Sequence, residues 1–332
     1  MLRNGRLILL LAAASWPVGW AASAETWHLE DGQAWQQISV EAKQAYDKAN
    51  DYLRKGKKIK AARSFDAFLK ECEPTSELYA AALEKQFSIG KEYLGGRRRR
   101  VLLLFKIKGY ATGVKMMERI SERASSGAVK AGAAAEGAAS GEESERLRNM
   151  EAYLKKLSAR AAVEVALHYE ARGRSDADYY ELAHQKWLEI LESYDNQLKV
   201  SSSQPTGEIG KDALLGMGRC KMVLYGGPAY DSTVLRGQPF TEEGVYGGAE
   251  GCYREFISRY PQEASRFGLD EELKKIEEEL AGKDLFTGRY YQKVGNKQAA
   301  NLYYQMVVRD WQGTAAAGTA QELLAANMES EK

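Results

Sequence analysis

One spacing pattern recurs, in whole or in part, in five stretches of this 332-residue chain. A small residue is followed by an aromatic residue three positions later, and further on an Ala or Gly is followed four positions later by an aromatic or large apolar residue. The last stretch has the pattern most completely, in Gly288, Tyr291, Gly295, Ala300 and Tyr304. Residues three and four positions apart share a helix face, and small residues let neighbouring helices approach closely. The pattern therefore predicts a succession of antiparallel helix pairs.

The rest of the sequence supports a helical chain. It contains only six prolines and is rich in Ala, Glu, Lys and Leu, which favour helix. The expected helices span residues 40–55, 59–72, 76–94, a segment from about 112, 149–172, 183–190, 211–225, 249–260, 269–294, a segment ending near 311, and 314–328.

The same spacing resembles the consensus of tetratricopeptide repeats, whose helix pairs stack into a solenoid that binds other proteins. The resemblance implies an all-α fold, a right-handed superhelix of about five tetratricopeptide-like helix pairs with a C-terminal capping helix. Repeats one and two would occupy residues 40–121, repeats three to five residues 149–312, and the capping helix with a tail residues 313–332. Residues 122–148 are rich in Ala, Gly and Ser and lack aromatic residues, which predicts a flexible insertion, with a partly helical segment as the alternative.

The N-terminus has the features of a secretory signal peptide. Arg3 and Arg6 precede a short apolar run at 7–14, and Ala22-Ser23-Ala24 matches a cleavage site. We expect a signal peptide at 1–24 and a polar leader at 25–39, with an uncleaved interfacial anchor as the alternative. Removing two arginines leaves 45 basic residues (47 − 2) against 46 acidic ones, a net charge of −1. Export and a near-zero charge both argue against nucleic-acid binding.

The three cysteines, Cys72, Cys220 and Cys252, can be either paired or free in an exported protein. Cys220 and Cys252 fall on the two expected helices of repeat four, so a disulfide between them is conceivable, although its geometry is demanding. Small buried thiols are the simpler expectation.

Several runs in the C-terminal half resemble the BamD (YfiO) family of outer-membrane assembly proteins. They are Gly-Met-Gly-Arg-Cys at 216–220, Tyr-Gly-Gly-Pro-Ala-Tyr-Asp at 225–231, Phe-Ile-Ser-Arg-Tyr-Pro at 256–261, and the segment 290–304. The resemblance implies an exported scaffold in outer-membrane β-barrel assembly, whose partners are a barrel-assembly protein and unfolded β-barrel clients. It implies a periplasmic location, and peripheral contact with the outer membrane stays open. Members of that family carry a cysteine directly after the signal peptide, whereas the first cysteine here is Cys72.

Candidate binding residues follow from the expected groove, which the first helix of each pair would line. Helical spacing places Lys43, Tyr46, Asn50, Arg54, Phe87 and Lys91 on this side. Aromatic side chains with amide and ammonium donors could hold a peptide that ends in an aromatic residue and a carboxylate, the ligand that the family resemblance implies. The alternative is that these are ordinary solvated side chains. By resemblance the C-terminal repeats would face the barrel-inserting partner, with Arg289 and Lys293 as contacts.

An unusual basic tract interrupts the second repeat. Arg97, Arg98, Arg99 and Arg100 precede the apolar run 101–105 and Lys-Ile-Lys at 106–108. One interpretation is contact with an anionic bilayer, with arginines at the head groups and leucines at the acyl chains. The other is a long loop whose leucines pack against the helices on either side.

Catalytic chemistry is not expected. His28, His168 and His184 lack the spacing of metal ligands, and the sequence contains no nucleophile elbow or phosphate loop. We therefore expect a non-enzymatic protein with no cofactor and no catalytic or metal site. The alternative functions are a periplasmic scaffold for cell-envelope or peptidoglycan maintenance, and a non-catalytic part of a cell-wall enzyme system. A cell-wall enzyme with a helical solenoid, such as a lytic transglycosylase, is the rival from another class.

Overall fold

The computed structural model describes residues 38–100, 106–195, 207–236 and 248–329. The predicted signal peptide and nearly all of the leader lie outside these residues. The described chain is all-helical apart from one short hairpin of strands, which confirms the prediction of an all-α fold. No helix among the described residues is both long and apolar enough to span a bilayer.

The helices of the described residues are α1 (Val40–Arg54), α2 (Lys58–Glu71), α3 (Glu77–Leu94), α4 (Tyr110–Glu136), α5 (Gly141–Gly173), α6 (Asp178–Ile190), α8 (Gly207–Leu224), α9 (Ala249–Arg259), α10 (Pro261–Ala264), α11 (Leu269–Lys293), α12 (Lys297–Asp310) and α13 (Ala315–Glu329). A π-helical turn (Leu191–Asp195) and two 3₁₀ turns (Ser232–Val234 and Ser265–Phe267) complete the helical structure. The strands are β1 (Arg98–Arg100) and β2 (Lys106–Lys108).

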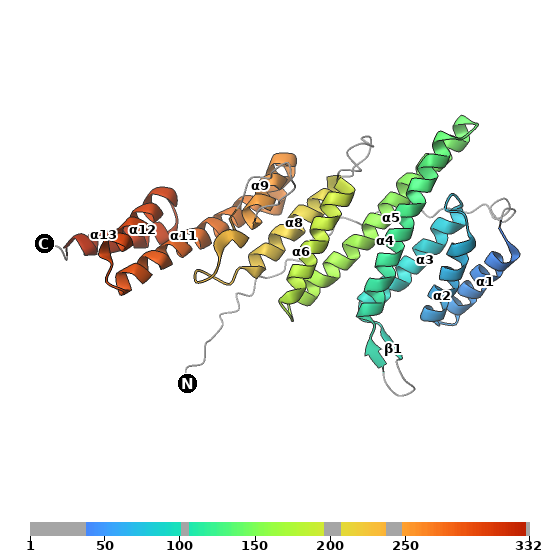
Figure 1. The fold of residues 1–332 in the computed structure, drawn as a ribbon, viewed down its shortest axis with the longest axis horizontal. Coiled ribbons are helices and arrows are strands. Elements are labelled where there is room, and N and C mark those ends of the chain that lie inside the picture. Colours follow the sequence, from blue (N-terminus) through green and yellow to red (C-terminus); the bar gives the residue numbers. More distant parts are fainter. Residues whose placement is uncertain (1–37, 101–105, 196–206, 237–247, 330–332) are drawn as a thin grey trace.

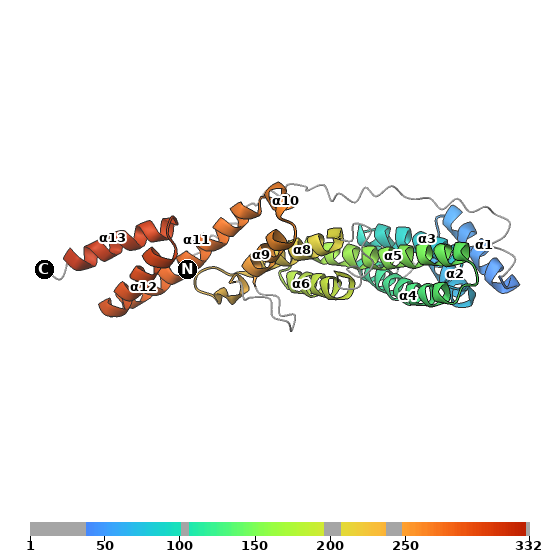
Figure 2. The same ribbon diagram turned by 90° about the horizontal axis from the view of Figure 1, so that it is seen from above.

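Consecutive helices pack on one another along an elongated molecule (Figure 1). The pairs α1–α2, α3–α4, α5–α6, α8–α9 and α11–α12 form hairpins, α4 packs on α5, α6 packs on α8, and α13 packs on α12. Seen from above, α3, α5 and α8 lie on one side of the row, and α4 and α6 lie on the other (Figure 2). Between α3 and α8, the first helices of the pairs therefore form one layer, and the second helices α4 and α6 form another.

Local sequence signals account for most helix boundaries. The side chains of Ser39, Ser76 and Asn296 accept hydrogen bonds from backbone N–H groups in the first turns of α1, α3 and α12. Gly56 and Gly295 follow α1 and α11 with φ values of +68° and +84°, which non-glycine residues rarely adopt. Where a cap or a glycine is present, the observed boundaries lie within a few residues of those expected.

Close contacts between small and large residues join the helices, as the repeating pattern predicts. A Cβ atom added at Gly288 of α11 would lie 2.6 Å from a ring carbon of Tyr304 on α12. At Gly113 of α4 it would lie 2.7 Å from the backbone nitrogen of Leu94 on α3. At Gly218 of α8 it would lie only 2.2 Å from a ring carbon of Tyr253 on α9. These positions let the helix axes approach more closely than any larger residue would permit.

The buried residues of the described part of the chain form three clusters rather than one core. The first joins α1 to α5, the second runs from α5 to α11, and the third lies among α11, α12 and α13. Two long helices each belong to two clusters. Leu154 and Ala162 of α5 lie in the first and second clusters, and Ile276 and Leu285 of α11 lie in the second and third.

The prediction of a flexible insertion at 122–148 is wrong, because these residues continue α4 and begin α5. Ala124, Ala128 and Ala131 are fully buried along one face of α4. They belong to the same cluster as Met150 and Leu154 of α5. Small side chains bury little area individually, yet they allow two long helices to pack closely. The Ala-rich composition therefore reflects close helix packing and not a linker.

The basic tract forms an antiparallel hairpin and not the long loop that one interpretation expected. Arg98 pairs with Lys108, Arg99 with Ile107, and Arg100 with Lys106. Residues 101–105, whose leucines were expected to pack on the helices, lie outside the described residues. Figure 1 shows the hairpin extending beyond the ends of α3 and α4.

Cys72, Cys220 and Cys252 are buried and none of them is in a disulfide, so the conceivable bridge between Cys220 and Cys252 is not formed. Burial raises the pKa of the Cys220 and Cys252 thiols to about 12. The simpler expectation of small buried thiols is confirmed.

Candidate binding surface on the first helices

The two aromatic residues predicted to line the groove are core residues. Tyr46 lies edge-on to Phe65 and Phe68 of α2, with ring centroids 5.7 Å and 5.0 Å away. Lys85 of α3 donates a hydrogen bond of 2.8 Å to its hydroxyl. Phe87 is only 4% exposed. The expectation that these two rings present open aromatic surface is wrong, because neighbouring helices cover them.

The polar residues predicted on α1 lie nearer to solvent. Lys43 and Arg54 are exposed, and Asn50 is half-buried. The Asn50 amide donates to the Tyr46 carbonyl at 3.1 Å and accepts from the Lys85 ammonium at 2.9 Å. Asn50 therefore helps to join α1 to α3, while Lys43 and Arg54 remain on the surface.

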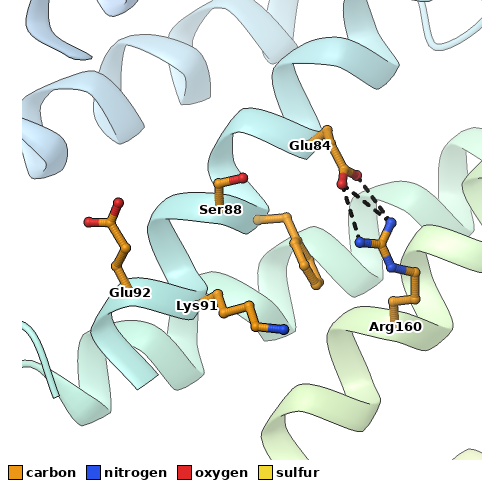
Figure 3. Close-up of a pocket in the computed structure, with 6 residues that line it drawn as sticks. Glu84, Ser88, Lys91, Glu92 and Arg160 are labelled. Atoms are coloured by element: carbon orange, nitrogen blue, oxygen red, sulfur yellow. Dashed lines mark hydrogen bonds and ion pairs between the residues drawn. The ribbon is translucent and has the colours of Figure 1, made fainter. Parts of the chain in front are cut away.

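An open hollow of about 420 Å³ lies between α3 and α5. The residues that line it are Glu84, Phe87, Ser88, Lys91, Glu92 and Arg160 (Figure 3). It contains two of the predicted residues, Phe87 and Lys91. Arg160 could not be found from the pattern, because nothing in the sequence relates a residue of α5 to α3. Glu84 lies three positions before Phe87 on the same helix, so the helical spacing could have found it.

Arg160 of α5 contacts two of the α3 residues that line this hollow, Phe87 and Glu84. Its guanidinium carbon lies 4.7 Å from the centroid of the Phe87 ring, so the cation covers the ring face. It also forms an ion pair with Glu84 at 3.3 Å (Figure 3). The Tyr153 hydroxyl donates to Glu84 at 3.1 Å. Burial and the Glu84 carboxylate raise the pKa of Tyr153, so this hydroxyl stays protonated at neutral pH and can donate.

Lys91 and Glu92 form the more exposed end of the hollow. The Lys91 side chain is 61% exposed and pairs with Glu164 of α5 at 2.5 Å. Glu92 pairs with Lys58 at 3.0 Å and with Arg97. Partial burial would raise the pKa of Glu92, but the two cations outweigh that effect and lower it.

Polar contacts continue along the layer of first helices. The carboxylate of Glu170 on α5 accepts from Nε of Arg219 on α8 at 2.6 Å and from a terminal nitrogen of the same guanidinium at 3.0 Å. It also accepts from Trp187 Nε1 at 3.3 Å. With the Lys85 and Arg160 contacts, each pair of neighbouring first helices from α1 to α8 is joined by a cation. This side of the molecule is therefore a polar surface on which hydrogen bonds of Lys85 and ion pairs of Arg160 and Arg219 join the helices.

Arg289 and Lys293, the predicted partner contacts, are exposed on the C-terminal half of α11. The sequence reasoning missed an apolar stripe beside them. Phe286, Tyr290 and Val294 recur at a spacing of four residues and are 47%, 57% and 57% exposed. That spacing is visible in the sequence, but in a helix pair it usually indicates a buried face.

The histidines do not form a metal site in the described residues. No group of three or more His, Cys, Asp or Glu side chains there is placed to hold an ion. His28 lies outside the described residues. The ring of His168 stands 5.1 Å from that of Tyr110. His184 Nε2 is buried without a hydrogen-bond partner, and burial together with Lys221 lowers its pKa to about 4.

Comparisons with protein-family models, with curated proteins and with solved structures give no match to this chain. Any assignment of function therefore depends on the residues and geometry described above.

Proposed function

We propose that this protein is an exported, non-enzymatic scaffold that binds other polypeptides during outer-membrane β-barrel assembly, in the manner of the BamD family. In this proposal the helix pairs are tetratricopeptide-like units of a right-handed superhelix, and α13 is the cap. The observation that carries the proposal is the repeated close contact of a small residue with a large one between neighbouring helices, as at Gly288 and Tyr304. The repeat consensus requires this contact.

The hollow between α3 and α5 would receive the end of a client chain. Its cations already hold carboxylates of the protein itself, at Glu84 and Glu164. An exposed ion pair such as Lys91–Glu164 contributes at most about 1 kcal/mol, so a client carboxylate could replace Glu164 at small cost. The guanidinium plane of Arg160 offers a surface on which an aromatic side chain can stack.

The C-terminal half of α11 would contact the barrel-assembly partner. Here Phe286, Tyr290 and Val294 supply exposed apolar surface, and Arg289 and Lys293 supply the charges. Interfaces are commonly built from aromatic and apolar residues surrounded by a polar rim. This surface is separate from the hollow, so client and partner could bind together.

Site-specific cross-linking tests the client proposal. A photo-reactive residue is placed at Ser88 or at Lys91, which are exposed in the hollow, and at Lys70 of α2 as a control. We expect the first two positions, and not the third, to label a peptide that carries the C-terminal sequence of an outer-membrane barrel. Equal labelling from all three positions, or none from the hollow, would refute the proposed client site.

Capture from detergent-solubilised outer membranes tests the partner proposal. We expect the wild-type protein to retain a barrel-assembly protein and a Tyr290→Ser variant to lose most of it. Recovery of peptidoglycan-associated proteins instead would favour the alternative scaffold of cell-envelope maintenance and contradict the proposal. Glycan cleavage by the purified protein would contradict a non-enzymatic role.

A further inference from the structure

Four aromatic rings form a continuous series where α4, α5 and α6 meet. The ring centroids of Tyr110 and His168 are 5.1 Å apart. The centroids are 6.1 Å apart both for His168 with Tyr169 and for Tyr169 with Tyr179. Arg172 of α5 joins the two ends of this series, because its guanidinium carbon lies 5.0 Å from the centroid of the Tyr110 ring and 4.7 Å from that of the Tyr179 ring. Aromatic rings of the two neighbouring helices therefore fix the position of this cation.

Arg172 differs from the other half-buried arginines in its lack of a carboxylate partner. Within the described residues, each of the others forms an ion pair, namely Arg123–Asp66, Arg160–Glu84, Arg219–Glu170 and Arg259–Glu255. Arg172 forms none there, and its guanidinium donates a hydrogen bond of 3.4 Å to the Tyr179 hydroxyl. Nearby Asp176 accepts instead from the backbone N–H of Asp178. A cation partly withdrawn from water without an anion is unfavourable, so an external anion at Arg172 would be stabilising.

Two further cations lie at the same end of α4. Lys108 Nζ of β2 lies 5.5 Å from the centroid of the Tyr110 ring, which is the ring that Arg172 also contacts. Arg98 of β1 stands opposite Lys108 in the hairpin, and directly opposite side chains lie on the same face of a strand pair. Both residues are exposed, and within the described part of the chain neither forms an ion pair with an acidic residue. Three cationic side chains therefore gather here without a carboxylate.

The backbone around Tyr110 holds this arrangement in place. A Cβ atom added at Gly96 would lie 3.2 Å from the Tyr110 hydroxyl oxygen, so the ring lies against the turn before β1. The Gly109 N–H donates a 3.0 Å hydrogen bond to the Arg97 carbonyl and closes the base of the hairpin. The ring that Lys108 and Arg172 both contact is therefore positioned before any ligand arrives, which lowers the entropic cost of binding a small anion.

We propose that Arg98, Lys108 and Arg172 form a binding site for a phosphate group. A guanidinium positioned by aromatic rings can donate two N–H groups to neighbouring phosphate oxygens, and an ammonium adds a compact charge. A phosphate group carries a charge of about −1.5 to −2 at neutral pH and at least three acceptor oxygens, which suits three cations. A carboxylate carries a single charge and would leave more of the positive charge uncompensated. Free phosphate and a phosphorylated lipid head group both offer this chemistry.

Equilibrium dialysis of radiolabelled inorganic phosphate against the whole chain, at constant ionic strength, tests this inference. A charge-assisted hydrogen bond contributes about tenfold to affinity, so three such contacts give a dissociation constant of about 1 mM. Lys108→Gln and Arg172→Gln should each weaken phosphate binding about tenfold. Acetate should displace the labelled phosphate at least about tenfold less effectively than unlabelled phosphate does.

A matched control removes one positive charge from the same helix. Lys115 of α4 is exposed, and Lys115→Gln should change phosphate binding by less than about twofold. Circular dichroism of each variant separates lost binding from lost structure. Arg172 is half-buried and its replacement can disturb the packing of α5, whereas Lys108 is exposed and Lys108→Gln should keep the wild-type spectrum. Lys108→Gln therefore decides the test if Arg172→Gln is misfolded.

Vesicles added on the protein side of the dialysis membrane identify the source of the phosphate group. Displacement of the labelled phosphate by phosphatidic acid vesicles, and not by phosphatidylcholine vesicles, would identify a lipid head group as the ligand. Displacement by neither kind of vesicle would identify a soluble phosphate compound. Both results support the site, because both require that the wild-type protein binds phosphate.

The inference is overturned if the wild-type protein binds no phosphate at about ten times the expected dissociation constant. It is equally overturned if Lys108→Gln binds as the wild type does, if Lys115→Gln loses as much binding, or if acetate competes as well as phosphate. The hollow between α3 and α5 and the exposed stripe of α11 do not include these cations. Failure of the phosphate assay and failure of the proposed scaffold function are therefore separate results.

Discussion

Replacing Gly288 with alanine should destabilise the C-terminal helix pair, whereas the same change at Gly282 of the same helix should stabilise it. A Cβ at Gly288 would lie 2.6 Å and 2.8 Å from two ring carbons of Tyr304 and 3.2 Å from Tyr303 Cβ. The Tyr304 ring cannot easily move aside. It is fully buried, and its hydroxyl donates a 2.6 Å hydrogen bond to Gln292. At Gly282 nothing lies within 4 Å of the added atom.

The expected magnitudes follow from two opposing effects. Alanine is favoured over glycine inside a helix by about 1 kcal/mol at either position. Overpacking of a buried contact typically costs about 1–3 kcal/mol, and a 2.6 Å approach to a fixed ring belongs in the upper part of that range. Gly288→Ala should therefore lower the free energy of unfolding by about 1–2 kcal/mol. Gly282→Ala should raise it by up to about 1 kcal/mol.

Urea denaturation followed by far-ultraviolet circular dichroism and tryptophan fluorescence measures this difference. Trp311 packs against the cluster that contains Tyr304, so its emission reports on the affected region. The two variants should move the transition midpoint in opposite directions. If Gly288→Ala is as stable as Gly282→Ala, the close approach of α11 and α12 does not depend on the small residue. The claim that the small residues of the repeated pattern are needed for helix packing would then be refuted.

Two further predictions concern charge. His184 has a pKa of about 4 in the folded protein against 6.5 when unfolded, so protonation favours the unfolded state. Stability is complete above pH 6.5 and should fall by up to about 3 kcal/mol as the pH drops toward 4, a loss that His184→Gln should reduce in urea titrations at several pH values. Asp66 of α2 accepts hydrogen bonds from Arg119 at 2.9 Å, Arg123 at 2.5 Å and Gln86 at 3.0 Å, and Asp66→Ala should cost about 1–3 kcal/mol in thermal denaturation. An unchanged unfolding temperature would mean that this network does not hold α2 against α4.

Helix positions were predictable from the sequence because their signals are local. A serine or asparagine cap, a glycine with positive φ and a three-to-four-residue spacing each depend on a few neighbouring positions. Ser76 and Gly56 are examples, and the helices beside them begin and end close to where they were expected. The succession of helix pairs follows from the same signals together with the short turns that connect them.

Which side chains remain exposed could not be predicted, because that depends on contacts between helices. Spacing places Tyr46 and Phe87 on one side of their helices, but only the structure shows that α2 covers the first and Arg160 of α5 covers the second. The error at 122–148 has a related cause. Alanine gives little evidence of burial in a sequence, and Ala128 is buried because α4 packs against α3 and α5.

The division into three buried clusters has a consequence for mechanical load. A pull exerted by a partner on the C-terminal half of α11 would reach the first cluster only through α11, the second cluster and then α5. The third cluster is the smallest of the three and lies nearest to that force. The third cluster should therefore unfold first under tension, while the helices around the hollow between α3 and α5 stay folded.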